Sequence, residues 1–122
     1  MKKFNEYVNA MIEKCEVTKD ELQDDFHFNK FSDFLTNSGE RYYKNGRLLS
    51  FFKTIRSGVN EGVNRDEVID YLVSTKQRYE KNRLQDNPVN FSTNPMANII
   101  RLWNFEMYAE FIKHINAMLS RI

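Results

Sequence analysis

Residues 94–120 decide the fold, and they read NPMANIIRLWNFEMYAEFIKHINAMLS. Asn94-Pro95 is a helix start signal, because an Asn side chain caps free backbone N–H groups and proline fits the first helical position. Apolar residues then recur every three or four positions, which predicts one long helix over about 94–120. They form two stripes that are rotated around the helix axis: Met96, Ile99, Ile100, Trp103 and Met107, then Phe111, Ile112, Ile115, Met118 and Leu119.

The apolar residues of this helix are spread more widely than one neighbouring helix can cover. Leu102 and Phe105, for example, lie outside the first stripe. The helix is therefore predicted either to be central to the core or to form a subunit interface. Either alternative would cover the apolar residues that one neighbouring helix leaves exposed. The residues assigned to such an interface are Leu102, Phe105, Ile112 and Leu119.

Helical periodicity also marks the first third of the chain. Residues 2–15 predict a helix with one apolar face, formed by Phe4, Tyr7, Val8, Met11, Ile12 and Cys15. Thr18-Lys-Asp-Glu21 has the pattern of a capping box, which predicts that a new helix runs from about 19 to 27. A break near Phe28–Asn29 and a second short helix to about Leu35 are expected to follow.

The middle of the chain predicts two more helices. In the first, Leu48, Phe52 and Ile55 form an apolar stripe. If this helix ran back through Asn45-Gly46, Arg41 would fall at the centre of the stripe, where an unpaired charge is costly. We therefore expect either a helix break at Asn45-Gly46 or a partner that faces Arg41, and a helix end at Gly58.

The second of these helices is predicted to begin after Asn64-Arg-Asp-Glu67, an N-cap followed by acidic residues that favour the helix dipole. It runs to about Leu84 and is expected to bury Val68, Leu72, Thr75 and Tyr79. Both prolines lie within the predicted linker 85–95. The whole chain, 1–122, is thus predicted to be a single all-α domain, a compact bundle of about five helices.

Composition agrees with a folded helical protein and bears on its location. Hydrophobic residues make up 41% of the chain, which excludes a disordered protein, and 4 Gly and 2 Pro favour few, long elements. Cys15 is the single cysteine, so an intramolecular disulfide is impossible and a reducing compartment, the cytoplasm, is expected. We expect no membrane span and no secretory signal, because no long apolar run occurs and the N-terminus has no apolar segment.

Catalytic and metal-binding patterns do not emerge from the sequence. His27 and His114 are far apart and neither belongs to a paired ligand motif, while Cys15 lies on an apolar stripe where a buried, inert thiol is expected. No Gly-x-Ser-x-Gly motif or glycine-rich phosphate loop is present. The sequence therefore predicts a protein that is not an enzyme, with no cofactor, metal or evident small-molecule substrate.

Positive charge is concentrated in the middle of the chain. Residues 41–83 carry 10 Lys/Arg against 5 Asp/Glu, whereas residues 1–40 carry 5 against 9. This pattern is consistent either with attraction between the two segments or with a nucleic-acid backbone site. The basic candidates are Arg41, Lys44, Arg47, Lys76 and Arg83, and Tyr42, Tyr43 and Tyr79 are candidates for stacking on bases.

One family shares scattered features with residues 34–112. Phe34-Leu-Thr-Asn-Ser-Gly-Glu-Arg41 resembles the Leu-Thr-Thr-Ser-Gln-x-Arg signature of the helical small subunit in type III-A CRISPR effector complexes. Asp66-Glu-Val-Ile69 with Lys76, Tyr79 and Arg83 is similar to its next helix, and Phe105-x-x-Tyr-x-Glu-x-Ile112 to its last. Asn37, Gly39 and Lys81-Asn82 depart from the pattern. The resemblance implies a non-catalytic subunit along a guide RNA, with Arg41, Lys76 and Arg83 as its basic positions.

The function expected from the sequence is that of a non-catalytic helical assembly protein, which binds a protein or ribonucleoprotein partner or associates with itself. Two alternatives remain. One is a small phage or mobile-element regulator that inhibits a host protein, which the compact size and the AT-rich bias of the composition also fit. The other is a helix-turn-helix DNA-binding protein over residues 47–84, although Ser57–Asn64 is longer than the usual tight turn.

Overall fold

The computed structural model describes residues 1–23, 37–85 and 94–122, and these residues form helices and no strand. The helices are α1 (Lys2–Gln23), α3 (Asn37–Asn60), α4 (Arg65–Gln85) and α5 (Pro95–Leu119). The all-α prediction is confirmed, but the described residues contain four helices where about five were predicted. Several predictions lie outside the described residues: the break near Phe28–Asn29, the short helix to Leu35, most of the linker 85–95, and His27.

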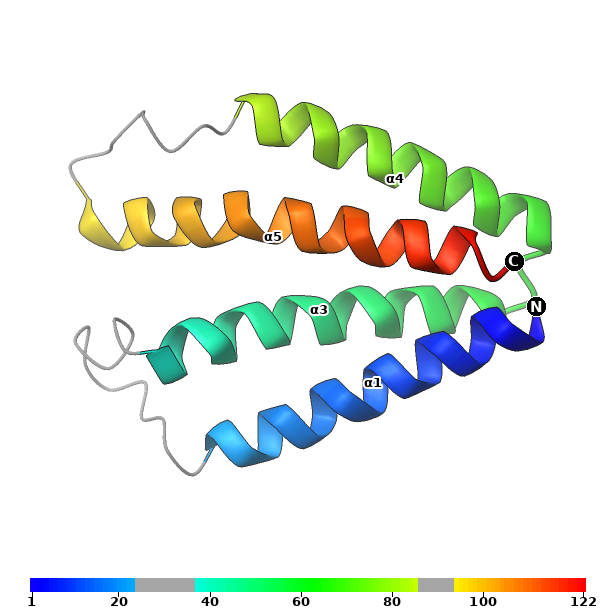
Figure 1. The fold of residues 1–122 in the computed structure, drawn as a ribbon, viewed down its shortest axis with the longest axis horizontal. Helices are drawn as coiled ribbons and strands as arrows, with labels where there is room; N and C mark the ends of the chain where they lie inside the picture. Colours follow the sequence, from blue (N-terminus) through cyan, green and yellow to red (C-terminus); the bar gives the residue numbers. More distant parts are fainter. Residues whose placement is uncertain (24–36, 86–93) are drawn as a thin grey trace. The chain divides into compact units, whose positions relative to one another are not determined.

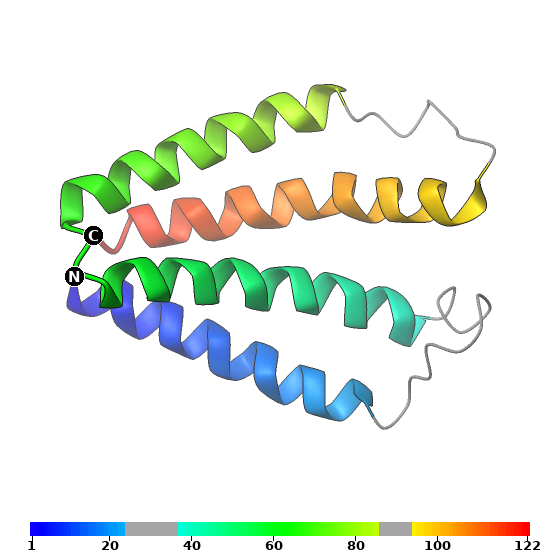
Figure 2. The same ribbon diagram turned by 180° about the vertical axis from the view of Figure 1, so that it is seen from behind.

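The chain divides into two compact units, Lys2–Gly62 and Val63–Ile122. Each unit is a hairpin of two antiparallel helices, α1 with α3 and α4 with α5 (Figure 1, Figure 2). The prediction of a single domain over 1–122 stays a prediction.

The first hairpin is joined by contacts of three kinds between α1 and α3. The rings of Tyr7 and Phe52 meet edge to face, with centroids 6.3 Å apart. The Lys53 ammonium and the Glu16 carboxylate form an ion pair at 2.8 Å. The Asn45 side-chain amide donates a hydrogen bond to the backbone carbonyl of Cys15 at 2.8 Å. Apolar residues of both helices are buried: Phe4, Val8, Ile12, Cys15, Leu22, Leu49, Phe51, Phe52 and Ile55.

The predicted helix boundary at Thr18 is wrong, because α1 continues without interruption to Gln23. The Thr18 hydroxyl donates to the carbonyl of Lys14, one turn earlier, at 3.0 Å. A threonine that bonds back in this way is satisfied inside a helix and does not act as an N-cap. Residues 2–15 and 19–23, which were predicted to belong to separate helices, are therefore parts of one helix.

Of the two alternatives for this segment, the break at Asn45-Gly46 is wrong, and so is the predicted end at Gly58, since α3 runs through both. Arg41 is exposed, so the charge that argued for a break carries no desolvation cost. Asn45 gains a partner on α1, and nothing lies within 4 Å of where a Cβ on Gly46 would be. The chain turns at Gly62 instead, where φ is 92° and the backbone N–H donates to the carbonyl of Val59.

Both predicted caps of the second hairpin are confirmed. The Asn64 Oδ1 accepts from the backbone N–H of Glu67 at 2.9 Å, and its amide donates to the Glu67 carboxylate at 3.3 Å. The Asn94 Oδ1 accepts from the N–H groups of Met96 and Ala97 at 3.0 and 3.4 Å, and Pro95 is the first residue of α5. These side chains replace hydrogen bonds that the first turn of a helix cannot make internally.

Aromatic stacking joins α4 to α5. The Tyr79 ring stacks on Phe111 at 5.0 Å and 22°, and it lies 5.7 Å from Tyr108. Burial of Val68, Leu72 and Thr75 on α4 is confirmed, whereas Tyr79 is half-buried. Five of the six buried residues of α5 come from the predicted stripes, Trp103, Met107, Phe111, Ile115 and Met118, and the sixth, Tyr108, belongs to neither stripe.

Two kinds of feature are absent from the described part of the chain. No helix within it is both long enough and apolar enough to span a membrane. Within the same residues, no group of three or more His, Cys, Asp or Glu side chains is placed to bind a metal ion.

Candidate protein-binding surface

The predicted nucleic-acid residues of α3 lie within about two turns of the helix. Arg41 is exposed, while Lys44 forms an ion pair with Glu40 at 3.0 Å. The Arg47 guanidinium donates to the Tyr43 hydroxyl at 3.5 Å, and Tyr43 is half-buried, as is Tyr42. Lys44 and Arg47 thus contact side chains of their own helix, and their contact with a phosphate backbone stays a prediction.

The corresponding residues of α4 belong to the other hairpin. Lys76 is half-buried, and the Arg83 guanidinium lies 5.9 Å from the centre of the Phe105 ring. The Tyr79 ring contacts Phe111 on α5 and has the Arg78 guanidinium 5.4 Å from its centre. These contacts give Tyr79 a packing role within the hairpin, and base stacking by this ring stays a prediction.

The four predicted interface residues of α5 share one strip of the helix. Leu102, Phe105, Ile112 and Leu119 follow steps of three and seven, and Ala109 and Asn116 fill the steps between them. Residues at alternating steps of three and four lie along one side of an α-helix. We call this set of six the α5 seam: Leu102, Phe105, Ala109, Ile112, Asn116 and Leu119.

The α5 seam is only partly covered. Leu102 is 41% exposed, Ala109 and Asn116 are exposed, and Phe105, Ile112 and Leu119 are half-buried. The fully buried residues of α5, such as Met107, Phe111 and Ile115, point to another side of the helix by their spacing. The seam is therefore an apolar strip beside the packed face and distinct from it.

A groove lies where the seam meets the C-terminal half of α4. It has a volume of about 490 Å³ and is lined by Glu80, Arg83, Leu84, Phe105 and Ile112. Leu84 is 83% exposed, the highest value among the exposed large hydrophobic residues of the described chain. Three of the five lining residues are apolar, one is acidic and one is basic, a composition that suits a protein partner with an apolar residue at its centre.

Among the large apolar residues of this surface, Leu84 is the one that sequence reasoning missed. In the sequence prediction it marks only the approximate end of a helix. Its signal was present in the spacing, because Leu84 does not continue the Val68, Leu72, Thr75 and Tyr79 stripe and so points away from the packed face. An apolar residue off the stripe near a helix end is a candidate contact residue.

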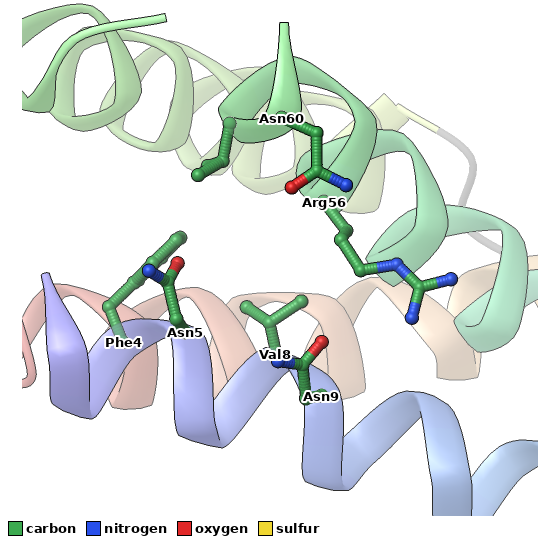
Figure 3. A pocket seen from close by; sticks show the side chains of 7 residues that line it. Phe4, Asn5, Val8, Asn9, Arg56 and Asn60 are labelled. Atoms are coloured by element: carbon green, nitrogen blue, oxygen red, sulfur yellow. The ribbon is translucent and has the colours of Figure 1, made fainter. Parts of the chain in front are cut away.

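A smaller pocket lies within the α1–α3 hairpin (Figure 3). Its volume is about 150 Å³. The pocket combines an apolar part with three carboxamides and one guanidinium: Phe4, Val8 and Val59, then Asn5, Asn9, Asn60 and Arg56. Asn9 and Asn60 are exposed, Asn5 is half-buried and Phe4 is fully buried, so the side chains of Asn9 and Asn60 lie nearest the solvent.

The single thiol is held in an unreactive setting. Cys15 is buried on α1, and burial raises the pKa of its thiol, an effect only partly offset by the nearby Lys14 ammonium. A raised pKa lowers the fraction of thiolate, which is the nucleophilic form. Cys15 thus fits the packing role that its position on the apolar stripe predicts.

Comparisons with protein-family profiles, with curated protein sequences and with solved structures gave no match to this chain. The resemblance of residues 34–112 to a CRISPR small subunit therefore stays a prediction.

Proposed function

We propose that this chain is a non-catalytic helical assembly protein that binds a protein partner through the α5 seam and the adjoining groove. The observation that carries the proposal is the exposure of Leu84 beside Phe105 and Ile112 in that groove. Association buries such apolar surface, and a few residues near the centre of an interface commonly supply most of the binding free energy.

The test compares two apolar-to-acid substitutions at exposed positions. Leu84→Asp changes the groove, and Val17→Asp is the matched control, because Val17 is 52% exposed and lies on α1. A partner retained by the tagged wild-type chain is identified by mass spectrometry, purified, and titrated against each variant by calorimetry. Leu84→Asp is expected to weaken binding at least about tenfold, and Val17→Asp should leave it unchanged.

Equal binding by Leu84→Asp and wild type would overturn this assignment of the surface. So would a chain that retains no partner and does not associate with itself. Circular dichroism of both variants shows whether the helices are intact, so that a lost contact is separated from a lost fold.

The same purification distinguishes the partner classes expected from the sequence. A ratio of absorbance at 260 to 280 nm that falls after ribonuclease treatment indicates a ribonucleoprotein partner, as the CRISPR resemblance implies. A nucleic-acid-free complex with one protein supports the inhibitor alternative.

A further inference from the structure

The α5 seam has the spacing of a coiled-coil strip. Its six residues follow steps of 3, 4, 3, 4 and 3. Such a sequence of steps keeps apolar side chains facing a partner helix over several turns. Phe105, Ile112 and Leu119 occupy one repeating position, and Leu102, Ala109 and Asn116 the other.

The seam can pair with the seam of a second copy that runs in the opposite direction. When two copies of α5 are laid antiparallel with residue numbers that sum to 221, Leu102 faces the partner's Leu119. In the same register Ala109 faces the partner's Ile112, so that a small side chain lies opposite a large one, and Phe105 lies opposite the partner's Asn116. Every position then has its contact twice, as the two-fold symmetry of a homodimer requires.

Charge along the edge of the seam favours the same pairing. Glu106 and Lys113 each follow a seam residue, they are seven positions apart, and both are exposed. In the antiparallel register Glu106 of one copy lies near Lys113 of the other, and the symmetry repeats this contact. In a parallel pair the two copies of Glu106 would lie on opposite edges of the contact, as would the two copies of Lys113, so the Glu106–Lys113 contact would not form.

We infer that the partner at the α5 seam is a second copy of this chain, bound antiparallel through a two-fold axis near Ala109 and Ile112. This inference rests on the proposed function, since it names the occupant of the surface described there. In the dimer, two α4–α5 hairpins bring four helices together. The groove that contains Leu84 lies at the edge of the contact.

A charge exchange tests the register. Lys113→Glu alone and Glu106→Lys alone each place like charges opposite each other twice per dimer, and each is expected to raise the dimer Kd about tenfold. The double variant, Glu106→Lys with Lys113→Glu, restores opposite charges and should return the Kd to within about threefold of wild type. Sedimentation equilibrium over a range of protein concentrations measures each Kd.

Two further variants separate the contact from general effects of charge. Ala109→Arg introduces a long side chain at an exposed position of the seam, and it should give a folded monomer. Lys81→Glu is the control for charge reversal, because Lys81 is exposed on α4 and lines no part of the groove. Its Kd should equal that of wild type.

The outcomes distinguish this inference from the proposed function. A wild-type chain that is monomeric at every concentration overturns the second copy as partner. If Leu84→Asp weakens the binding of a different protein in that case, the proposed function stands. A wild-type dimer that is insensitive to Ala109→Arg, or whose double charge variant stays as weak as the single ones, overturns the antiparallel seam.

Discussion

Gly46 and Gly62 have opposite backbone requirements. Gly46 lies inside α3 with open space where a Cβ would lie, whereas Gly62 has a φ of 92° in the turn after α3. Gly46→Ala should raise the free energy of unfolding by about 0.5–1 kcal/mol, because alanine loses less backbone entropy in a helix. Gly62→Ala should lower it by about 1 kcal/mol or more, since a Cβ is strained at positive φ. Urea unfolding of both variants gives the two signs, and equal signs would contradict the turn at Gly62.

Glu16 and Lys53 link the two helices of the first hairpin by charge. The hydrogen bond from Lys53 lowers the pKa of the Glu16 carboxyl, and the charge of Lys53 adds to this effect. A lowered pKa in the folded state stabilises the fold above the unfolded-state pKa, and this contribution disappears as the pH falls through the folded-state pKa.

Lys53→Met removes that partner and keeps most of the side-chain length. The Glu16 pKa should then rise toward the ordinary range of a glutamic acid, and acid unfolding should lose its dependence on this residue. Carboxyl chemical shifts recorded by NMR across acid pH measure the pKa directly. An unchanged Glu16 pKa would show that Lys53 is not its main partner.

At the scale of helices, the two Asn caps differ in their acidic neighbours. The first turn of α4 contains Asp66 and Glu67, and the first turn of α5 contains no acidic residue. Asn64→Ala and Asn94→Ala should each cost about 1 kcal/mol of stability, because each removes a bond to free N–H groups.

Asp substitutions at the same caps should separate them. Asn94→Asp keeps the acceptor and adds a negative charge at a helix N-terminus, so stability should equal or exceed wild type. Asn64→Asp loses the hydrogen bond to the Glu67 carboxylate and places a like charge beside it, so stability should fall. Thermal unfolding of the four cap variants, measured at neutral pH, checks the order; a gain at Asn64 would contradict the Glu67 contact.

These caps also show which helix boundaries a sequence can predict. The predictions at Asn64 and Asn94-Pro95 were correct, since each Asn side chain accepts from backbone N–H groups in the first turn of the helix that follows. Thr18, like Asn64, is followed by Glu three positions later, but its hydroxyl donates to the Lys14 carbonyl. Whether such a residue caps a helix or lies inside one depends on whether the helix continues past it. Asn45-Gly46 has the composition of a turn, yet Asn45 bonds to the Cys15 carbonyl thirty positions away. A contact at that distance along the chain leaves no local signal.

At the scale of the whole molecule, the candidate surface was predictable in part. The wide spread of apolar residues on α5 indicated Leu102 and Phe105, which lie outside the first stripe, and Ile112 and Leu119 of the second stripe, because one neighbouring helix cannot cover them all. Leu84 was missed, since its importance depends on how α4 packs beside Phe105 and Ile112. The groove is formed jointly by residues 80–84 of α4 and residues 105–112 of α5, so neither helix predicts it alone.

Self-association through the seam has a thermal consequence for the whole chain. Mass action stabilises a dimer relative to unfolded monomers, so the Tm should rise as the protein concentration increases. Differential scanning calorimetry at several concentrations should show this rise for wild type and a constant Tm for Ala109→Arg. A wild-type Tm that is independent of concentration would contradict a dimer of the folded chain.

The burial of Cys15 in the first hairpin makes this residue a natural reporter of local opening. It is the single cysteine of the chain, so a thiol reagent can modify the protein at one position only. The rate of modification under native conditions therefore measures how often the Lys2–Gly62 unit exposes α1, with no contribution from thiols in Val63–Ile122. Amide hydrogen exchange in α5 gives the corresponding rate for the second unit. Comparing the two rates would show whether the halves of the chain open together or one at a time.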